Sequence, residues 1–310
     1  MHIPVLLREV LLTLRPRRGQ VLVDCTLGLG GHSAELLWRI LPTGHLAAID
    51  FDPASIEIAR GKLGAIPGAA GHFHLFHNNF AALPTLLAQM AMEAGLPLET
   101  KADGLLADLG VSSPQIDTPE RGFSYRAPGP LDMRMDPSRG QPASALVNRL
   151  SERELAEALL ELGDESDAEK IARLLVERRS QAPIETTEQL MALVCEARDF
   201  TLKRAAGAKL HPAARTFQAL RILTNRELAN LERLLAVLPE VLKPGGVAAV
   251  ITFHSGEDRR VKKAFKEGLR RGVYSEIAPD PILADEQEIA ENKRARSAKL
   301  RWARRAPIDS

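Results

Sequence analysis

Hydrophobic positions in much of the chain alternate between the spacing of strands and the spacing of helices. Short aliphatic or β-branched runs occur at 20–26, 45–50, 73–76, 104–109 and 247–253. Between the first of these runs, residues 33–41 and 53–63 carry apolar side chains at helical spacing. Strands that alternate with helices predict an α/β fold with a parallel sheet covered on both faces, and right-handed crossovers make it doubly wound.

The middle of the chain has a different pattern. Residues 112–141 are rich in proline, glycine and charge, yet they contain aromatic and methionine residues, which favours an ordered connection over a flexible linker. Helical patterns follow, two of which begin with a capping box, Ser151 to Glu154 and Thr186 to Gln189. We therefore expect a small all-α domain inserted into the α/β domain.

The predicted insert covers residues 118–212, so the α/β domain consists of residues 1–117 and 213–310. In its second segment, residues 215–238 have the apolar spacing of one long amphipathic helix. The sequence at 243–246, Lys-Pro-Gly-Gly, predicts a sharp turn before the run at 247–253.

Composition limits the classes of function. The net charge of the 310 residues is only +1, so nucleic-acid binding would have to come from local clusters of cations. Two isolated cysteines give no disulfide framework, and neither a secretory signal nor an apolar segment long enough to cross a membrane is visible, so we expect a cytoplasmic protein without a membrane contact. His72, His74 and His77 lack a nearby carboxylate or cysteine to complete a metal site, and we predict no metal.

A nucleotide-type site is predicted where the first strand ends. Gly28, Gly30 and Gly31 form a glycine-rich turn between this strand and a helix, and Asp50 ends the next strand, where a carboxylate can accept hydrogen bonds from ribose hydroxyls. Asp24 beside the turn would repel a pyrophosphate and could attract an ammonium group. This favours S-adenosylmethionine over NAD, although NAD is not excluded because Ser33 could serve as the third small residue of a dinucleotide motif.

A second polar segment follows the strand at 104–109. Asp108, Ser112, Ser113 and Gln115 stand at the carboxyl end of this strand, which is where ligands bind in open α/β sheets. A carboxylate, two hydroxyls and an amide therefore converge on the crevice where a ligand is expected. We therefore take Ser113 and Asp108 as candidate catalytic residues, with Asp108 also a candidate cofactor ligand.

The sequence resembles the bacterial ribosomal small-subunit RNA (cytosine-N4)-methyltransferases, the MraW family. Matching stretches span nearly the whole chain, and Gly129–Asp136 is the most specific; Gly256 departs from the leucine usual in the family. They are His2–Leu7, Gly28–Ser33, Asp108–Gln115, Glu120–Ser124, Gly129–Asp136, His211–Ile222, Phe253–Ser255, Glu257–Arg259 and Arg294–Ser297.

The resemblance implies a class I, Rossmann-like methyltransferase domain with an inserted helical domain. It implies S-adenosylmethionine as the cofactor and a decoding-centre cytosine of 16S ribosomal RNA, methylated on N4 within the small subunit, as the substrate. Related proteins also lead us to expect a homodimer. The cofactor contacts that it implies are Gly30, Gly31, His32, Asp50, Phe80, Asp108 and Gln115.

Candidate RNA contacts lie in two regions. Phe123 and Tyr125 could stack on an unstacked base, and Arg134 could hold a phosphate. The C-terminal basic run, which contains no acidic residue, is a stronger phosphate candidate and includes Arg294 and Arg296. Its members are Lys293, Arg294, Arg296, Lys299, Arg301, Arg304 and Arg305.

Three other functions remain open at this point. A nicotinamide-dependent oxidoreductase would use a similar sheet, but Asp24 argues against it. A ribosome-assembly factor that only binds RNA is opposed by the complete set of glycine turn, Asp50 and Asp108. A DNA amine methyltransferase shares a Ser-Pro pair like Ser113–Pro114, but Gln115 departs from the motif of that class.

Overall fold

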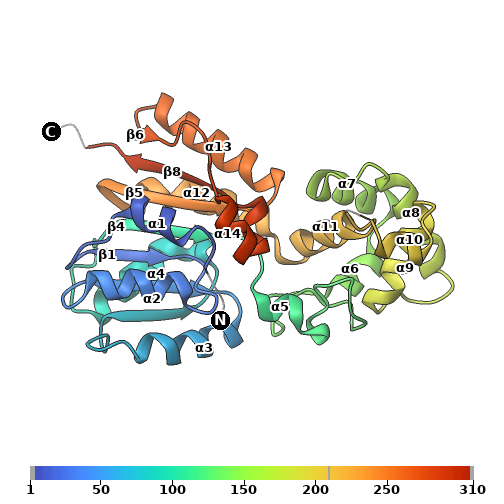
Figure 1. Cartoon of the computed structure of the whole chain (residues 1–310), viewed down its shortest axis with the longest axis horizontal. Coiled ribbons are helices and arrows are strands. Elements are labelled where there is room, and N and C mark those ends of the chain that lie inside the picture. Colours follow the sequence, from blue (N-terminus) through green and yellow to red (C-terminus); the bar gives the residue numbers. More distant parts are fainter. Residues whose placement is uncertain (1–3, 209, 308–310) are drawn as a thin grey trace. The chain divides into compact units, whose positions relative to one another are not determined.

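The computed structural model describes residues 4–208 and 210–307 and contains two compact units. One unit combines residues up to Gly110 with those from Leu228 onward, and the other consists of Val111–Glu227. His2 and Ile3 of the N-terminal matching stretch, and the outer bounds of the predicted α/β domain, lie outside the described residues. Figure 1 shows the first and last parts of the chain, in blue and orange-red, within the same sheet unit.

The sheet unit is built on a mostly parallel sheet of strand order β3-β2-β1-β4-β5-β8-β6, with β7 paired to β8. The strands from β3 to β5 run parallel, whereas β8 is antiparallel to β5, β6 and β7. Their bounds are β1 Val21–Asp24, β2 His45–Asp50, β3 Phe73–His77, β4 Ala102–Asp108, β5 Leu242–Thr252, β6 Tyr274–Ile277, β7 Ile282–Leu283 and β8 Lys299–Arg305.

Helices cover both faces of this sheet. Alternate residues of β1 point to opposite sides, so Val23 packs with α4, α12 and α13, and Leu22 packs with α1, α2 and α3. The α/β class with a doubly wound sheet is thus confirmed. The helices of the unit are α1 Leu7–Leu14, α2 Gly31–Ile40, α3 Pro53–Gly64, η1 Phe80–Ala82, α4 Leu83–Glu93, α12 Glu227–Val241, α13 Ser255–Arg270, α14 Glu286–Glu291 and η3 Lys293–Ser297.

The second unit is helical and has its own core. Leu131, Leu159, Ile171 and Leu190 are among its fully buried side chains. The helices are α5 Ser113–Asp117, η2 Pro119–Arg121, α6 Ala143–Arg149, α7 Glu152–Gly163, α8 Ala168–Arg179, α9 Thr187–Ala197, α10 Leu202–Ala206 and α11 Ala214–Asn225. Ser151 and Thr186 form capping boxes at the starts of α7 and α9, as their sequence pattern predicts.

The expected single helix at 215–238 is wrong. Arg226 adopts a left-handed conformation, with φ of 52°, and separates α11 from α12. Helix α11 packs so closely on α7 that a Cβ at Gly163 would lie 2.6 Å from the carbonyl oxygen of Arg215. The helical unit consequently extends to Glu227, which is farther than the insert expected at 118–212.

The Lys-Pro-Gly-Gly sequence also differs from its expected role. It does not precede the strand but lies inside β5, where the pairing with β4 shifts register between Ala102 and Gly104. A bulge of this kind accommodates extra residues without ending the strand.

The C-terminal basic run is part of the sheet. Arg301 on β8 is buried, with its Nε 2.6 Å from Oδ1 of Asp258 on α13. Arg304 pairs with Glu276 at 3.3 Å, and the Arg305 guanidinium donates to the carbonyl oxygen of Val273 at 2.7 Å. The expectation that the whole run offers cations to phosphate is therefore wrong for Arg301, which is buried, whereas Arg304 and Arg305 have partners within the chain but are partly exposed.

The sequence predicts neither a membrane-spanning segment nor a metal site, and the described residues bear on both predictions. Among residues 4–208 and 210–307, no helix is long and apolar enough to cross a membrane. The same part of the chain holds no group of three or more His, Cys, Asp or Glu arranged to hold a metal ion. His72 and His74 instead lie beside His45, with ring centroids 5.1 and 5.8 Å from that of His45.

Candidate active site

The carboxyl ends of β1, β2 and β4 are connected through the turn that follows β1. The hydroxyl of Thr26 accepts a hydrogen bond from the backbone N–H of Asp108 at 2.7 Å. The backbone N–H of Gly28 donates to Oδ2 of Asp50, also at 2.7 Å. These two contacts fix the strand-end residues Asp50 and Asp108 around the turn that follows β1, at the edge of the sheet where α/β proteins bind ligands.

The turn itself depends on glycine. Gly28 and Gly30 have positive φ angles of 49° and 71°, and a Cβ on Gly30 would lie 3.2 Å from that of Ala59 on α3. At Gly31, where α2 begins, a Cβ would come within 2.6 Å of Pro4. The turn therefore packs so closely against α3 and Pro4 that side chains at Gly30 and Gly31 would force neighbouring groups to move.

Asp24, at the end of β1, holds the two ends of the turn together through hydrogen bonds. Its side chain is buried, and Oδ2 accepts from the hydroxyl of Ser33 at 2.7 Å while Oδ1 accepts from the N–H of Thr26 at 3.0 Å. Burial raises the pKa of this carboxyl despite these hydrogen bonds. Both oxygens of Asp24 thus have partners within the chain.

Asp50 ends β2 and lies partly buried beside the glycine turn. Besides Gly28, it receives the backbone N–H of Asp52 on Oδ1 at 2.8 Å. Burial raises the pKa of Asp50 to about 6, against the opposing effect of these two hydrogen bonds. Each carboxylate oxygen has a second lone pair, so Asp50 can still accept hydrogen bonds from a ligand.

Asp108 ends β4 and has one oxygen without a partner. Its Oδ1 is buried and makes no hydrogen bond with the described chain, whereas Oδ2 lies 3.6 Å from Nδ1 of His32. Nε2 of His32 lies 2.9 Å from the carbonyl oxygen of Val5 and must donate there. The contact of Nδ1 with Asp108 is therefore favourable only when a proton lies on one of the two groups.

Several carboxyl groups lie close together at this edge. Burial raises the pKa of Asp108 well above its ordinary value, and repulsion from Asp24 and Glu257 raises it further. Asp24 also adds to the raised pKa of Asp50. A cation placed among these carboxyls would relieve the repulsion, whereas a pyrophosphate would increase it.

The remaining cofactor and catalytic candidates lie on short helices. Phe80 is the first residue of η1 and packs, partly buried, against the core of the sheet unit. In the helical unit, Ser113 is the first residue of α5 and is partly exposed. Gln115 is buried, and its Oε1 accepts the backbone N–H of Ser112 at 2.9 Å. Gln115 thereby shapes the start of α5.

The aromatic RNA candidates of the helical unit have partners within it. Tyr125 stacks on His211, with ring centroids 4.4 Å apart, and meets Phe217 edge-on at 5.6 Å. Phe123 lies under the guanidinium of Arg121 at 5.8 Å. Both rings are partly exposed, so each retains surface that a base could contact.

The cationic RNA candidates differ in their surroundings. Arg134 makes a two-pronged contact with Asp132, at 2.8 and 2.7 Å, which holds the guanidinium in place. Arg294 and Arg296 lie on η3, where Arg296 is exposed and Arg294 partly exposed. Of the three side chains, that of Arg296 therefore has the most solvent contact.

Comparison with known proteins identifies the family. The profile of the MraW methylase family matches residues 1–306. The chain belongs to the MraW methylase family. A relative named Ribosomal RNA small subunit methyltransferase H from Acidobacterium capsulatum is 42% identical over 305 residues, which cover 97% of each chain. One of the same name from Sorangium cellulosum is 44% identical over 304 residues, covering 98% of this chain and 90% of the relative.

A solved structure, a putative rRNA methylase from Clostridium thermocellum, is similar to this MraW-family chain with a TM-score of 0.43 and 12% sequence identity. The similarity covers 98% of this chain and 100% of the other.

The strand-end residues fit S-adenosylmethionine, the cofactor of MraW methylases. Its ammonium and sulfonium groups are cations, which suit an edge carrying Asp24, Asp50 and Asp108. The buried Oδ1 of Asp108, which has no partner in the described chain, can accept from a donor such as an ammonium group. The site of this MraW-family chain therefore matches the chemical character of the cofactor.

Sequence reasoning missed two residues of this edge. Thr26 is not among the predicted site residues, although its hydroxyl accepts a hydrogen bond from the backbone N–H of Asp108. Glu257 was noted only as part of a matching stretch, yet it is buried and electrostatically coupled to Asp108. The spacing of His254 and Glu257 resembles a capping box at the start of α13, and this pattern could have drawn attention to Glu257.

Proposed function

We propose that this MraW-family chain uses S-adenosylmethionine to methylate N4 of a decoding-centre cytosine in 16S ribosomal RNA of the small subunit. The observation that carries the reaction type is the group of buried and partly buried carboxyls around a glycine turn, with one Asp108 oxygen left without a partner in the described chain. The family membership supports methyl transfer, and the names of the relatives support ribosomal RNA as substrate. The choice of cytosine N4 rests on the sequence resemblance.

Different residues of the chain would bind different groups of the cofactor. Asp50 would accept hydrogen bonds from the ribose hydroxyls, and the backbone of Gly28, Gly30 and Gly31 would line the neighbouring surface. Asp108 would accept from the ammonium group, a role that suits it better than Asp24, whose oxygens have internal partners. When bound, S-adenosylmethionine supplies a methyl group that its sulfonium centre already activates.

Further roles complete the proposed binding site. His32 would orient Asp108 through the contact at 3.6 Å, and Phe80 would contribute apolar surface. Gln115 would order the segment that begins at Ser112, while Ser113 would accept a hydrogen bond from the amine that becomes methylated. Holding the amine in line with the methyl group contributes most, because fixed orientation alone can lower a barrier by roughly 7–11 kcal/mol.

We assign RNA recognition to the helical unit together with η3. Phe123 and Tyr125 would stack on bases through their exposed surfaces, and Arg134 and Arg296 would contact phosphates, with Arg294 beside them. Because the aromatic rings are already packed within the unit, they would present a rigid surface to RNA and lose little conformational entropy on binding.

The alternative functions receive less support. An NAD-dependent oxidoreductase would have to place a pyrophosphate at an edge whose carboxyls already repel one another. A protein that only binds RNA during ribosome assembly would have no use for the buried, unpartnered oxygen of Asp108.

The proposed function is tested with small ribosomal subunits that lack the modification. Incubation with methyl-labelled S-adenosylmethionine should place the label in one nucleoside, identified after digestion as N4-methylcytidine. Naked 16S RNA in parallel shows whether the assembled subunit is needed. Label in a different nucleoside would refute the cytosine assignment, and transfer to neither RNA would refute the enzymatic function.

Two further expectations depend on this function. A substrate within the ribosome would place the reaction in the cytoplasm. We also propose that the protein forms a homodimer, as expected from the resemblance, and sedimentation at several protein concentrations tests this directly; a single species of 33.9 kDa at all concentrations would refute it.

A further inference from the structure

Helix α13 presents a face of exposed basic residues that its role in the sheet does not require. Val261, Phe265 and Gly268 bury the opposite face against the sheet. The exposed cations are Arg259, Lys262, Lys263, Lys266 and Arg270. Their spacing of three, four, seven and eleven residues from the first places them on one side of the helix. We call this set the α13 basic face.

Acidic residues of the same helix do little to neutralise this face. Glu257 is buried beside His254, and Asp258 is engaged by Arg301 and Lys299. Glu267 pairs with Arg270 at 2.7 Å, at the end of the face. The α13 basic face therefore concentrates positive charge on a protein whose net charge is only +1.

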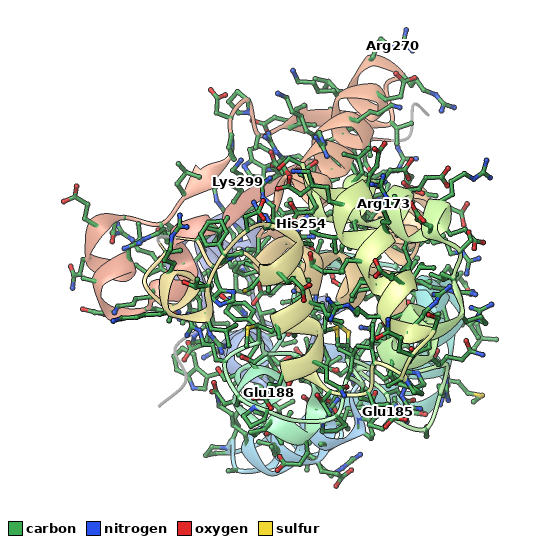
Figure 2. The ribbon with its side chains drawn as sticks, turned by 90° about the vertical axis from the view of Figure 1, so that its right-hand side faces the viewer. Arg173, Glu185, Glu188, His254, Arg270 and Lys299 are labelled. Atoms are coloured by element: carbon green, nitrogen blue, oxygen red, sulfur yellow. The ribbon has the colours of Figure 1, made fainter. Side chains whose placement is uncertain are left out.

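The position of α13 relates this face to the candidate active site. The helix begins directly after β5, at the sheet edge that carries Asp108, and leads away from it. Figure 2 labels His254 at the start of the helix and Arg270 at its end, where the arginine side chain projects outward. The eleven-residue span from Arg259 to Arg270 is about 16 Å long.

We propose that the α13 basic face binds the phosphate backbone of the RNA strand beside the target base. This inference rests on the proposed function and adds the surface along which the substrate lies. A row of cations about 16 Å long can follow several phosphates, since one strand carries a charge about every 3.4 Å. Lysines suit this role because they act as point charges without reading sequence.

The test compares two variants with the same change of net charge. Lys262→Glu combined with Lys266→Glu reverses the centre of the face. Arg17→Glu combined with Arg18→Glu reverses two exposed cations in the loop before β1, at the opposite edge of the sheet. Binding of 16S RNA fragments and of small subunits is measured at several salt concentrations, together with affinity for S-adenosylhomocysteine.

We expect the α13 variant to bind RNA about tenfold or more weakly, with a shallower salt dependence, while cofactor affinity stays unchanged. The control variant should bind RNA much as the unaltered protein does. Equal losses in both variants, or no loss in the α13 variant, would overturn the assignment of this face. Failure of the unaltered protein to bind RNA would instead refute the proposed function.

A second, independent observation concerns His254. Its side chain is 9% exposed, and neither ring nitrogen makes a hydrogen bond with the described chain. Nε2 lies 3.2 Å from Oε1 of Glu257, which is itself 3% exposed. Glu257 is a partner for Nε2 when that nitrogen carries a proton, which leaves Nδ1 as the buried ring nitrogen that another molecule could contact.

His254 lies beside the strand that ends at Asp108. Asp108 pairs with Ile251 across β4 and β5, and a Cβ at Gly110 would lie 3.3 Å from the ring of Phe253. The backbone that leads into His254 therefore follows the segment after Asp108. Gly256 adds space, since a Cβ there would lie 3.2 Å from Nδ1 of His254.

We infer that His254, oriented by Glu257, accepts the proton that the target amine loses on methylation. This also rests on the proposed function. The amine nitrogen uses its lone pair to bond the methyl carbon as the carbon–sulfur bond breaks and leaves its electrons on sulfur. The proton released from nitrogen goes to the lone pair of Nδ1, and Glu257 stabilises the resulting imidazolium through Nε2.

The test measures single-turnover methyl transfer between pH 5.5 and 8.5 for His254→Gln and Glu257→Gln, with S-adenosylmethionine saturating at every pH so that the titration of Asp50 does not affect the rate. His74→Gln is the matched control, because His74 is 8% exposed and its Nε2 also lacks a hydrogen bond, but it lies on β3. Folding is checked by thermal unfolding and by affinity for S-adenosylhomocysteine.

In the unaltered protein and in His74→Gln the rate should fall as the pH is lowered, because a protonated imidazole cannot accept a proton. His254→Gln should react about a hundredfold more slowly and lose this fall, with cofactor affinity retained. An unchanged pH profile in His254→Gln would overturn the role. If His254→Gln does not fold, Glu257→Gln provides the test. An unshifted dependence of its rate on pH would contradict the pairing of Glu257 with His254.

Discussion

Protonation of Asp50 should weaken cofactor binding in a defined range of pH. The carboxyl is charged when it accepts hydrogen bonds from ribose hydroxyls, and hydrogen bonds to a charged acceptor contribute roughly 1.5–3 kcal/mol. Burial raises the pKa of Asp50 from 3.8 to about 6. Cofactor affinity should thus be constant above about pH 7 and decline as the pH falls through 6.

The size of the effect follows from the titration. One pH unit below its pKa a carboxyl is about one-tenth ionised, so affinity at pH 5 should be about tenfold lower than at pH 7. The raised pKa has an opposite effect on the ligand-free protein. Because the unfolded chain ionises first, the free energy of unfolding decreases by about 3 kcal/mol as the pH rises from 3.8 to 6.

Isothermal titration calorimetry with S-adenosylhomocysteine measures the affinity from pH 5 to 7.5. Use of two buffers with different ionisation enthalpies also measures proton release, which should reach about half a proton near pH 6. Asp50→Asn is the control and should lose this part of the pH dependence. A steeper decline that persists in Asp50→Asn would point to Asp108, whose pKa is also raised.

Constant affinity between pH 5 and 7.5 would refute the reasoning. It would mean that Asp50 does not contact the ligand in its charged form, or that burial does not shift its pKa in this protein. The accompanying measurement of unfolding by urea separates the two explanations, because only the second removes the stability change between pH 3.8 and 6.

Three further predictions concern single substitutions. Ser113→Ala should slow methyl transfer about tenfold to a hundredfold while S-adenosylhomocysteine affinity, measured by calorimetry, is retained; loss of that affinity would show that Ser113 serves the cofactor instead. Gly163→Ala should destabilise the helical unit by about 1–3 kcal/mol, because its Cβ would lie 2.6 Å from the carbonyl oxygen of Arg215, and an unchanged melting temperature would contradict this packing. Arg301→Ala leaves Asp258 without its closest partner and should cost about 3 kcal/mol or more in urea unfolding; an unshifted midpoint would be the opposing result.

Local patterns were sufficient to predict much of the fold. Runs of apolar residues located β2 at His45–Asp50 and most of the other parallel strands, because burial on both faces requires continuous hydrophobic segments. Capping boxes located the starts of α7 and α9, since the hydrogen bonds of a cap involve residues only three positions apart.

Long-range pairing could not be predicted in this way. The sequence places cations at Arg301 and Arg304 but does not reveal Asp258 and Glu276, which lie far away in the chain. The break at Arg226 was also hidden, because a left-handed residue other than glycine has no clear signal. At the site, the strand-end aspartates were visible in the sequence, whereas the internal partners of Asp24 were not.

The strand order has a consequence for the folding of the protein during its synthesis. β8 follows all other described strands in the chain, yet it is placed between β5 and β6 and also pairs with β7. Until Lys299–Arg305 have left the ribosome, one edge of β5 has no partner and β6 and β7 cannot join the sheet. Nascent chains released before this point would expose an unpaired hydrophobic strand, which is a template for aggregation.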